Sequence, residues 1–578
     1  MTSKLTRRGL IGLTAGAGLA ACTSPESITG KNAFIVQSGA FAHGVASGDP
    51  FSTSVVLWTR VTPENDVDVD VDVDVIWEVF SDKSLKSLAA SGTFTASKSR
   101  DYCVKIIASD LMPGQEYFFR FRAGAAVSPI GRTRTLPEGS VDALRFAVVS
   151  CANWQHGYFN TYDAIAKRAE THAFDAMIHL GDYYYEYGAL DTPRMADRVH
   201  DPRHEIVELA DYRMRHAQYR SDAALQSATA AMPLIAVWDD HETSNDSWQT
   251  GAQNHQPDTE GDWEVRRQAA LRAYYEWMPV REPKPGRVRS DIYRNFRFGN
   301  LANLTCVETR LTARAEPIII ESYIDDITSE GGADKFRDEV LYAPEREMFG
   351  ADQQDFIINA LSQSKTDGVS WRLLANQVIM GRLLTPDFTP YISEDAVEKI
   401  EADWPEVRDF LNLSKYNMPV YPDSWDGYPV ARENFYAALD AANIHDMIVL
   451  TGDAHEFWLN DLTSEGGTKV GMEVVTSSVS SQTLTAYLGG ATAEHNLLLT
   501  KENPDAKYYN ALKNGFLDLT LNSKQVTVRM MSVDTVRSRD YTLTETARFK
   551  IRKSGQSIKA KSPKGLSLTQ RALFHGLG

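Results

Sequence analysis

The chain has 578 residues, of which 43% are hydrophobic, so it can bury a large core, and its length predicts about three or four domains. Its 77 acidic residues outnumber its 60 lysines and arginines, which gives a formal net charge of −17. Because nucleic-acid binders usually present a basic face, this balance argues against a specific nucleic-acid partner.

The first 22 residues have the features of a targeting segment. Arg7-Arg8 precede a mildly apolar run, residues 9–21, which is too short to span a bilayer as a mature anchor. This string resembles a twin-arginine export signal, so the twin-arginine translocase is an expected partner. The run ends at Cys22 like a bacterial lipobox, and Cys22 is either a lipidated amino terminus or incidental to ordinary cleavage. We therefore expect a periplasmic protein or a lipoprotein tethered to the membrane.

Residues 33–137 are predicted to form a small β-sandwich. Short runs of strand length alternate between apolar and polar residues and are separated by turn signals. The string Leu111-x-Pro-Gly-x-x-Tyr117 resembles the tyrosine-corner region of fibronectin type III domains. Pro137 and Gly139 then indicate a linker into the rest of the chain.

Four apolar runs end in residue types that bind metals. Residues 145–150 lead into Cys151, residues 176–180 into Asp182, residues 233–238 into Asp239, Asp240, His241, Glu242 and Asn245, and residues 447–450 into Asp453 and His455. A segment with helical spacing separates the first two runs, which predicts strand, crossover helix, strand. In an open α/β sheet, ligands bind beyond the carboxyl ends of the strands. Oxygen donors suit a hard cation, and imidazole, thiolate and phenolate suit a ferric or zinc ion, so we predict a shared metal site.

The other cysteines do not indicate a disulfide scaffold, because they are few and widely spaced. Cys103 and Cys306 lie in strand-like runs and are interpreted as small buried hydrophobes. Cys151 differs, because it follows a strand among polar neighbours, where a metal can hold a thiolate.

Later segments complete the predicted fold. Residues 316–349 are acidic and contain glycine, so we expect a covering loop. Asn376 lies in a strand-like run, and its carboxamide is a candidate substrate contact. Two late apolar segments, residues 472–477 and 516–530, predict strands that complete a two-sheet sandwich. The amphipathic stretch 566–577 is either a solvated terminus or a lid over an anionic site.

Several motifs occur in one order along the chain. They are Ser-Cys-x-Asn-Trp from Ser150, Leu-Gly-Asp-Tyr-x-Tyr-Glu-Tyr from Leu180, Trp-Asp-Asp-His-Glu from Trp238, Ala-Asn-Gln from Ala375 and Thr-Gly-Asp-x-His from Thr451. Together they resemble the PhoD family of alkaline phosphatases and phosphodiesterases, within the calcineurin-like metallophosphoesterases. The resemblance implies an α/β fold, a four-layer α/β/β/α sandwich behind a fibronectin III-like domain. The predicted division is a signal peptide and linker (1–32), the β-sandwich (33–137), the phosphoesterase domain (138–532) and a tail (533–578).

The resemblance also implies the cofactors and their ligands. A ferric ion (Fe3+) would be held by Cys151, Asp182, Tyr185, Asp453 and His455. Asp182 would bridge it to one or two calcium ions (Ca2+), and Asp240 and Asn245 would hold calcium or meet the phosphoryl oxygens. The later histidine motif of the superfamily has no clear counterpart here, and Asn376 is its substitute.

The implied reaction is hydrolysis of a phosphoester by in-line attack of a metal-bound hydroxide at mildly alkaline pH, with release of phosphate. His241 is the candidate general acid for the leaving group, and the alternative is a histidine that orients Asp240. Two other functions stay open. One is phospholipase D-like cleavage of lipid head groups, and the other is an exported binding lipoprotein whose metals only brace a surface.

Overall fold

The computed structural model describes residues 40–62, 72–190, 195–401, 405–483 and 493–561. The predicted export signal, Cys22 and the amphipathic stretch 566–577 lie outside these ranges. Within them, no helix combines the length and the apolar character needed to cross a bilayer.

The described chain contains a ten-stranded mixed sheet in the order β24-β23-β22-β21-β9-β10-β11-β1-β2-β5. At its centre β9 (Ala143–Val149), β10 (Ala176–His179) and β11 (Leu234–Ala236) run parallel to one another. The other strands are β1 (Val45–Gly48), β2 (Val55–Arg60), β5 (Cys103–Ala108), β21 (Gly515–Asn522), β22 (Gln525–Val533), β23 (Leu543–Ser554) and β24 (Ser557–Lys561). The central strands are almost wholly buried, which explains why they appear in the sequence as continuous apolar runs.

A second sheet has seven strands in the described residues, in the order β14-β15-β16-β17-β19-β18-β20. Its strands are β14 (Arg294–Phe298), β15 (Ala302–Cys306), β16 (Trp371–Asn376), β17 (Met447–Thr451), β18 (Phe457–Thr463), β19 (Lys469–Val475) and β20 (Ala506–Asn510). Side chains from the two sheets pack together in one core, where the rings of Phe146 and Phe298 lie 5.0 Å apart.

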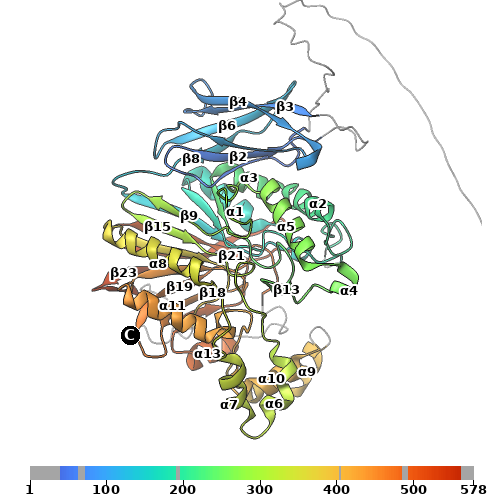
Figure 1. Ribbon diagram of the computed structural model, residues 1–578, viewed down its shortest axis with the longest axis vertical. Coiled ribbons are helices and arrows are strands. Elements are labelled where there is room, and N and C mark those ends of the chain that lie inside the picture. The colour runs from blue at the N-terminus through green and yellow to red at the C-terminus, as the bar shows by residue number, and fades with distance from the viewer. Residues whose placement is uncertain (1–39, 63–71, 191–194, 402–404, 484–492, 562–578) are drawn as a thin grey trace, which may run out of the picture. The chain divides into compact units, whose positions relative to one another are not determined.

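Helices cover both sheets. α1 (Asn160–Thr171) and α3 (Ala223–Ala231) contact the ten-stranded sheet, whereas α8 (Ala351–Thr366) and α11 (Pro429–Ala441) contact the seven-stranded sheet. Figure 1 shows α8 and α11 together along one side of the sheets. α5 (Trp263–Trp277) packs on α2 (Leu209–Arg220) and follows Asp262, whose side chain accepts from backbone N–H groups of the first turn. The predicted four-layer α/β/β/α arrangement is confirmed.

The amino-terminal part forms a β-sandwich, as predicted. One layer is a five-stranded sheet made of β3 (Val73–Phe80), β4 (Leu88–Ala96), β6 (Glu116–Ala123), β7 (Ala126–Val127) and β8 (Gly131–Arg134). The other layer consists of β1, β2 and β5. These three strands also form one end of the ten-stranded sheet, because β1 pairs in parallel with β11 at Gly48 and Leu234. The backbone N–H of Met112 donates to the hydroxyl of Tyr117 at 2.8 Å, as expected of a tyrosine corner.

The structure differs from the expected pattern in two segments. Residues 316–349, expected to be a covering loop, contain short helices: η3 (Ile320–Tyr323), α6 (Ile324–Thr328), α7 (Gly332–Phe336) and the π-helix η4 (Arg337–Leu341). Buried Ile327 and Phe336 in these helices pack with Leu413 of α10 (Val407–Ser414). The helices are therefore stabilised by tertiary contacts. Residues 543–561, assigned above to the tail, form β23 and β24 at the edge of the ten-stranded sheet.

The remaining elements are short or peripheral. They are η1 (Lys98–Arg100), η2 (Trp154–His156), β12 (Ser247–Trp248), β13 (Gly251–Ala252), α4 (Pro257–Glu260), η5 (Thr389–Tyr391), α9 (Glu394–Glu401), η6 (Trp425–Gly427) and α13 (Ala493–Glu502).

Candidate active site

The four predicted strand ends meet at one place. β9, β10 and β11 are neighbouring parallel strands, so their carboxyl ends share an edge, and β17 approaches from the other sheet. A Cβ atom on Gly181 would lie 2.4 Å from the Cβ of Asp239, and one on Gly452 would lie 2.8 Å from the Cβ of Ser150. Glycine at these two positions therefore permits the close approach of the segments that carry the candidate ligands.

Four of the candidate ligands have a left-handed backbone conformation. The φ angles are 61° at Cys151, 53° at Asp182, 60° at Asp453 and 59° at His455. Such a conformation costs a non-glycine residue about 1–3 kcal/mol and persists where the surroundings impose it. This strain after β9, β10 and β17 supports a functional site at these strand ends.

The donor atoms of these residues form three groups, and within each group all atoms lie within 4.8 Å of one another. The groups are Cys151 with Asp182 and His455; Asp182 with Asp240 and His241; and Asp182 with Asp239, Asp240 and Asp453. Asp182 belongs to all three groups, so its carboxylate lies at the centre of the cluster.

Tyr185 and His455 face the same carboxylate. The hydroxyl of Tyr185 donates to Oδ2 of Asp182 at 3.0 Å and lies 3.1 Å from Nε2 of His455. The Nδ1 atom of His455 lies 2.8 Å from the carbonyl oxygen of Gln482. Because a carbonyl oxygen only accepts, this contact places the ring proton on Nδ1 and leaves Nε2 as a metal-binding nitrogen.

Burial and the neighbouring acids both disfavour negative charge on the clustered carboxylates. Burial, followed by the nearby acids, raises the pKa values of Asp182 and Asp453 well above their ordinary range. In the described structure one carboxylate oxygen of each of Asp182 and Asp239 is buried without a hydrogen-bond partner. Buried carboxylate oxygens are costly unless they are paired or bind a cation. The thiol, phenol, imidazole and carboxylate donors therefore fit multivalent cations.

His241 pairs with Glu186, a residue that the motif analysis left without a role. The Nδ1 atom of His241 lies 2.7 Å from Oε2 of Glu186, and its ring packs 4.0 Å from the ring of Tyr185. Although burial opposes the shift, Asp240 and Glu186 raise the pKa of His241 well above its ordinary value. These two carboxylates favour the protonated ring, which is the form that a general acid requires.

The two predicted asparagines differ in position. The Oδ1 atom of Asn245 accepts from the Tyr187 hydroxyl at 2.8 Å, and its amide donates to Gln253 at 3.1 Å. Asn376 is fully buried in β16, where its amide donates to the carbonyl of Val378 at 2.5 Å and its Oδ1 has no partner among the described residues. The side-chain bonds of both asparagines thus go to groups outside the acid cluster, and their substrate contacts stay predictions.

Arg310 is the main residue that the sequence analysis missed. Its fully buried guanidinium pairs with Asp239 and with Asp423, the latter at 2.5 Å. Its Nη2 lies 3.5 Å from Oδ1 of Asp240 and 3.8 Å from Oδ1 of Asp453. Although burial opposes the shift, Arg310 and His241 lower the pKa of Asp240 to about 2. The sequence feature that could have indicated Arg310 as a site residue is its position soon after the apolar run that forms β15.

Known proteins are similar to this chain over most of its length. The PhoD-like phosphatase family model matches residues 146–530, and the model of the PhoD-like phosphatase N-terminal domain matches residues 29–137. Alkaline phosphatase D of Bacillus subtilis (strain 168) is 34% identical over 504 residues, which are 84% of this chain and 76% of that protein. A solved structure of PhoD aligns with a TM-score of 0.73 at 30% identity and covers 92% of this chain and 94% of its own.

Proposed function

Because the chain belongs to the PhoD-like phosphatase family and is a phosphoester hydrolase, we propose that it is an exported, metal-dependent alkaline phosphatase and phosphodiesterase. The observation that carries the metal dependence is the carboxylate of Asp182, which belongs to all three groups of donor atoms. Its unpaired Oδ1 supports a cation at this position.

In this proposal a ferric ion would be held by Cys151, Asp182, Tyr185, Asp453 and His455, and one or two calcium ions would be held by Asp182, Asp240 and Asn245. Thiolate and phenolate are strong ligands for a ferric ion, and carboxylate with carboxamide suits calcium. The bound cations would neutralise charge on the phosphoryl oxygens and lower the pKa of the attacking water.

His241 would protonate the leaving oxygen during in-line displacement. Glu186 holds Nδ1 of its ring at 2.7 Å, so Nε2 is the nitrogen that can deliver the proton. The amide of Asn245 would donate to a phosphoryl oxygen. The alternative role of His241, the orientation of Asp240, predicts a smaller loss when the ring is replaced.

The proposal of export rests on the Arg7-Arg8 string, and that of a lipid anchor rests on Cys22. Replacement of both arginines by lysine should leave the protein in the cytoplasm. Replacement of Cys22 by serine should release an exported, lipidated protein from the membrane and should change nothing if ordinary cleavage occurs. Fractionation of expressing cells measures both outcomes.

The test of the enzymatic function compares p-nitrophenyl phosphate, bis(p-nitrophenyl) phosphate and phosphatidylcholine as substrates, with elemental analysis of the same protein. We expect alkaline hydrolysis of the first two compounds and its loss after chelation. Faster cleavage of phosphatidylcholine would favour the phospholipase D-like function. Bound metal without hydrolysis of any ester would contradict the proposal and favour a binding lipoprotein.

A further inference from the structure

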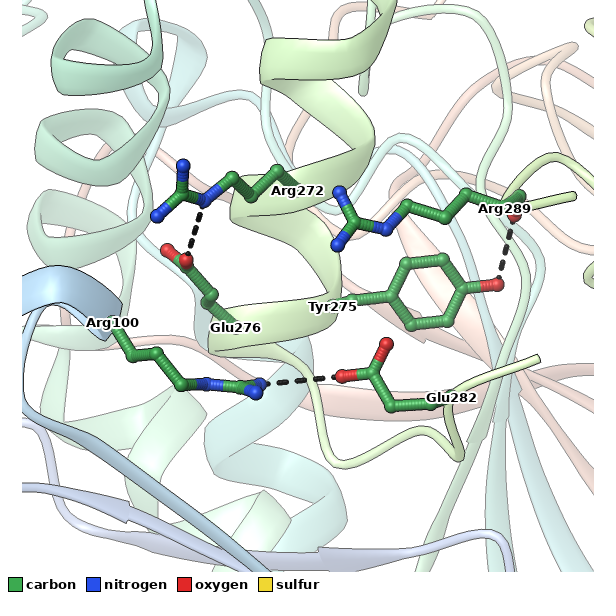
Figure 2. Close-up of a pocket in the computed structure, with 6 residues that line it drawn as sticks. All are labelled: Arg100, Arg272, Tyr275, Glu276, Glu282 and Arg289. Atoms are coloured by element: carbon green, nitrogen blue, oxygen red, sulfur yellow. Dashed lines mark hydrogen bonds and ion pairs between the residues drawn. The ribbon is translucent and has the colours of Figure 1, made fainter. Parts of the chain in front are cut away.

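A cavity of about 280 Å³ lies between η1 of the amino-terminal sandwich and the end of α5 (Figure 2). It is lined by Arg100, Arg272, Tyr275, Glu276, Glu282 and Arg289. None of these residues belongs to the candidate active site, so the cavity is a separate feature of the molecule.

Cations outnumber the carboxylates of this cavity. Glu276 accepts from Arg213 at 2.7 and 2.8 Å and from Arg272 at 2.9 Å. Glu282 likewise pairs with two cations, Arg100 at 3.2 Å and Lys105 at 2.9 Å. Each carboxylate is thus shared by two cations.

Arg289 adds a fifth cation. Among the residues that the structure describes, no carboxylate pairs with its guanidinium, and its backbone carbonyl accepts from the Tyr275 hydroxyl at 3.0 Å. Figure 2 shows this guanidinium directed toward the side of the cavity where Arg272 and Glu276 lie. Three arginines and two glutamates line the cavity. With Arg213 and Lys105, which pair with these glutamates from outside the lining, the cluster has a local excess of three positive charges in a chain of net charge −17.

Other acids near the cavity do not offset this excess, because each has its own arginine. Asp101 pairs with Arg60 at 2.8 Å, and Asp291 pairs with Arg287 at 2.8 Å. Asp49 pairs with Arg294 at 2.7 Å. The positive charge is therefore available to a ligand.

The walls of the cavity can rearrange at little cost. The side chains of Arg100, Arg272 and Glu282 are 44%, 42% and 44% exposed. The pair of Arg100 and Glu282 is exposed on both sides and contributes about 0–1 kcal/mol, so a bound anion can replace it. The base is rigid, because Tyr275 is buried and packs against Trp238 with ring centroids 6.1 Å apart.

We infer that this cavity is a second anion site, which binds inorganic phosphate or another small tetrahedral oxyanion through Arg289, Arg272 and Arg100. Guanidinium groups match such oxygens with paired N–H donors. The volume holds about nine waters at 30 Å³ each, so it accommodates a hydrated oxyanion but is below the usual range for larger ligands. A bound anion would brace the sandwich against α5.

The test is calorimetric titration of phosphate into the purified full-length protein and into its Arg289→Gln variant at constant ionic strength. We expect the wild-type protein to bind one more phosphate per chain than Arg289→Gln, or to bind it at least about tenfold more tightly, as the loss of a charged hydrogen bond implies. Arg287→Gln is the matched control, because Arg287 is two residues away and pairs with Asp291. It should bind phosphate like the wild type.

Binding at the active site is common to all three proteins, so only the difference between them reports on the cavity. Equal stoichiometry and affinity in Arg289→Gln and the wild type would overturn the inference and leave the cluster as an ion-pair network between two elements. An equal loss in Arg287→Gln would also overturn it, because the effect would then reflect general surface charge.

Discussion

Glu186 holds His241 by a hydrogen bond of 2.7 Å between Oε2 and Nδ1. Its other oxygen accepts from the backbone N–H of Asn245 at 2.7 Å and from the amide of Asn254 at 2.9 Å. A single buried carboxylate thus fixes both the ring of His241 and the loop that carries Asn245.

We predict that Glu186→Gln lowers kcat about 10- to 100-fold, as is typical when a group that orients a catalytic residue is lost. The amide keeps the shape of the side chain but removes the charge that stabilises the imidazolium. Steady-state kinetics on p-nitrophenyl phosphate measure the effect. Glu260→Gln is the control, because Glu260 pairs with His255 at 3.2 Å outside the candidate site. Equal rates in wild type and Glu186→Gln would rule out this role.

Cys151→Ser should lose bound iron and activity. Cys151 is fully buried and its sulfur belongs to one donor group with Asp182 and His455. Serine is a far weaker ligand for a ferric ion than a thiolate. Elemental analysis and activity are the measurements, with Cys306→Ser as the control, because Cys306 is buried in β15. Full iron content in Cys151→Ser would contradict the ligand assignment.

Arg310→Lys should reduce both activity and stability. A lysine keeps the charge but cannot pair with Asp239 and Asp423 at once, and a carboxylate left unpaired costs about 1–3 kcal/mol. Because Asp239 adjoins Asp240, we expect weaker metal binding and at least a tenfold loss of activity. Thermal unfolding and metal titration test this, with Arg432→Lys, whose buried partner is Asp426, as the control. If the control loses activity equally, the effect belongs to stability alone.

Gly48→Ala should destabilise the junction between the sandwich and the ten-stranded sheet. An added Cβ would lie 2.3 Å from the carbonyl oxygen of Pro279 and 2.6 Å from that of Leu234, so backbone must move. Such overpacking costs about 1–3 kcal/mol. The control is Gly466→Ala, because the nearest atom there is 3.8 Å away, and it should change stability by less than about 0.5 kcal/mol. Urea unfolding of the wild type, Gly48→Ala and Gly466→Ala measures both changes in the free energy of unfolding.

Asp518→Asn should make the free energy of unfolding less dependent on pH in the acidic range. Asp518 accepts from Arg145 at 2.9 and 2.6 Å and from Arg168 at 2.7 Å. Although burial opposes the shift, these arginines lower the pKa of Asp518. A lowered pKa stabilises the fold above the unfolded value of about 3.9 and loses this effect as the pH falls through the folded value. The variant should therefore be less stable by about 3 kcal/mol at pH 7, with a smaller difference near pH 3. Unfolding curves across this range that stay equally far apart would refute the linkage.

The sequence by itself determined the strands and the residues that follow them. β9, β10, β11 and β17 are buried on both faces, so each appears as a continuous apolar run, and Cys151, Asp182, Asp240 and Asp453 come soon after these runs. The order of the motifs also indicated the family, because it extends over most of the chain.

Only the tertiary structure decided which groups surround those residues. Arg310 meets Asp239 across 71 positions and Asp423 across 113, and His241 meets Glu186 across 55. Likewise β1, β2 and β5 belong to both the sandwich and the ten-stranded sheet, because Gly48 of β1 pairs with Leu234 of β11. Such contacts cannot be seen in the spacing of apolar residues along the chain. This spacing shows which face of a helix or strand is buried, but not which other element packs against that face.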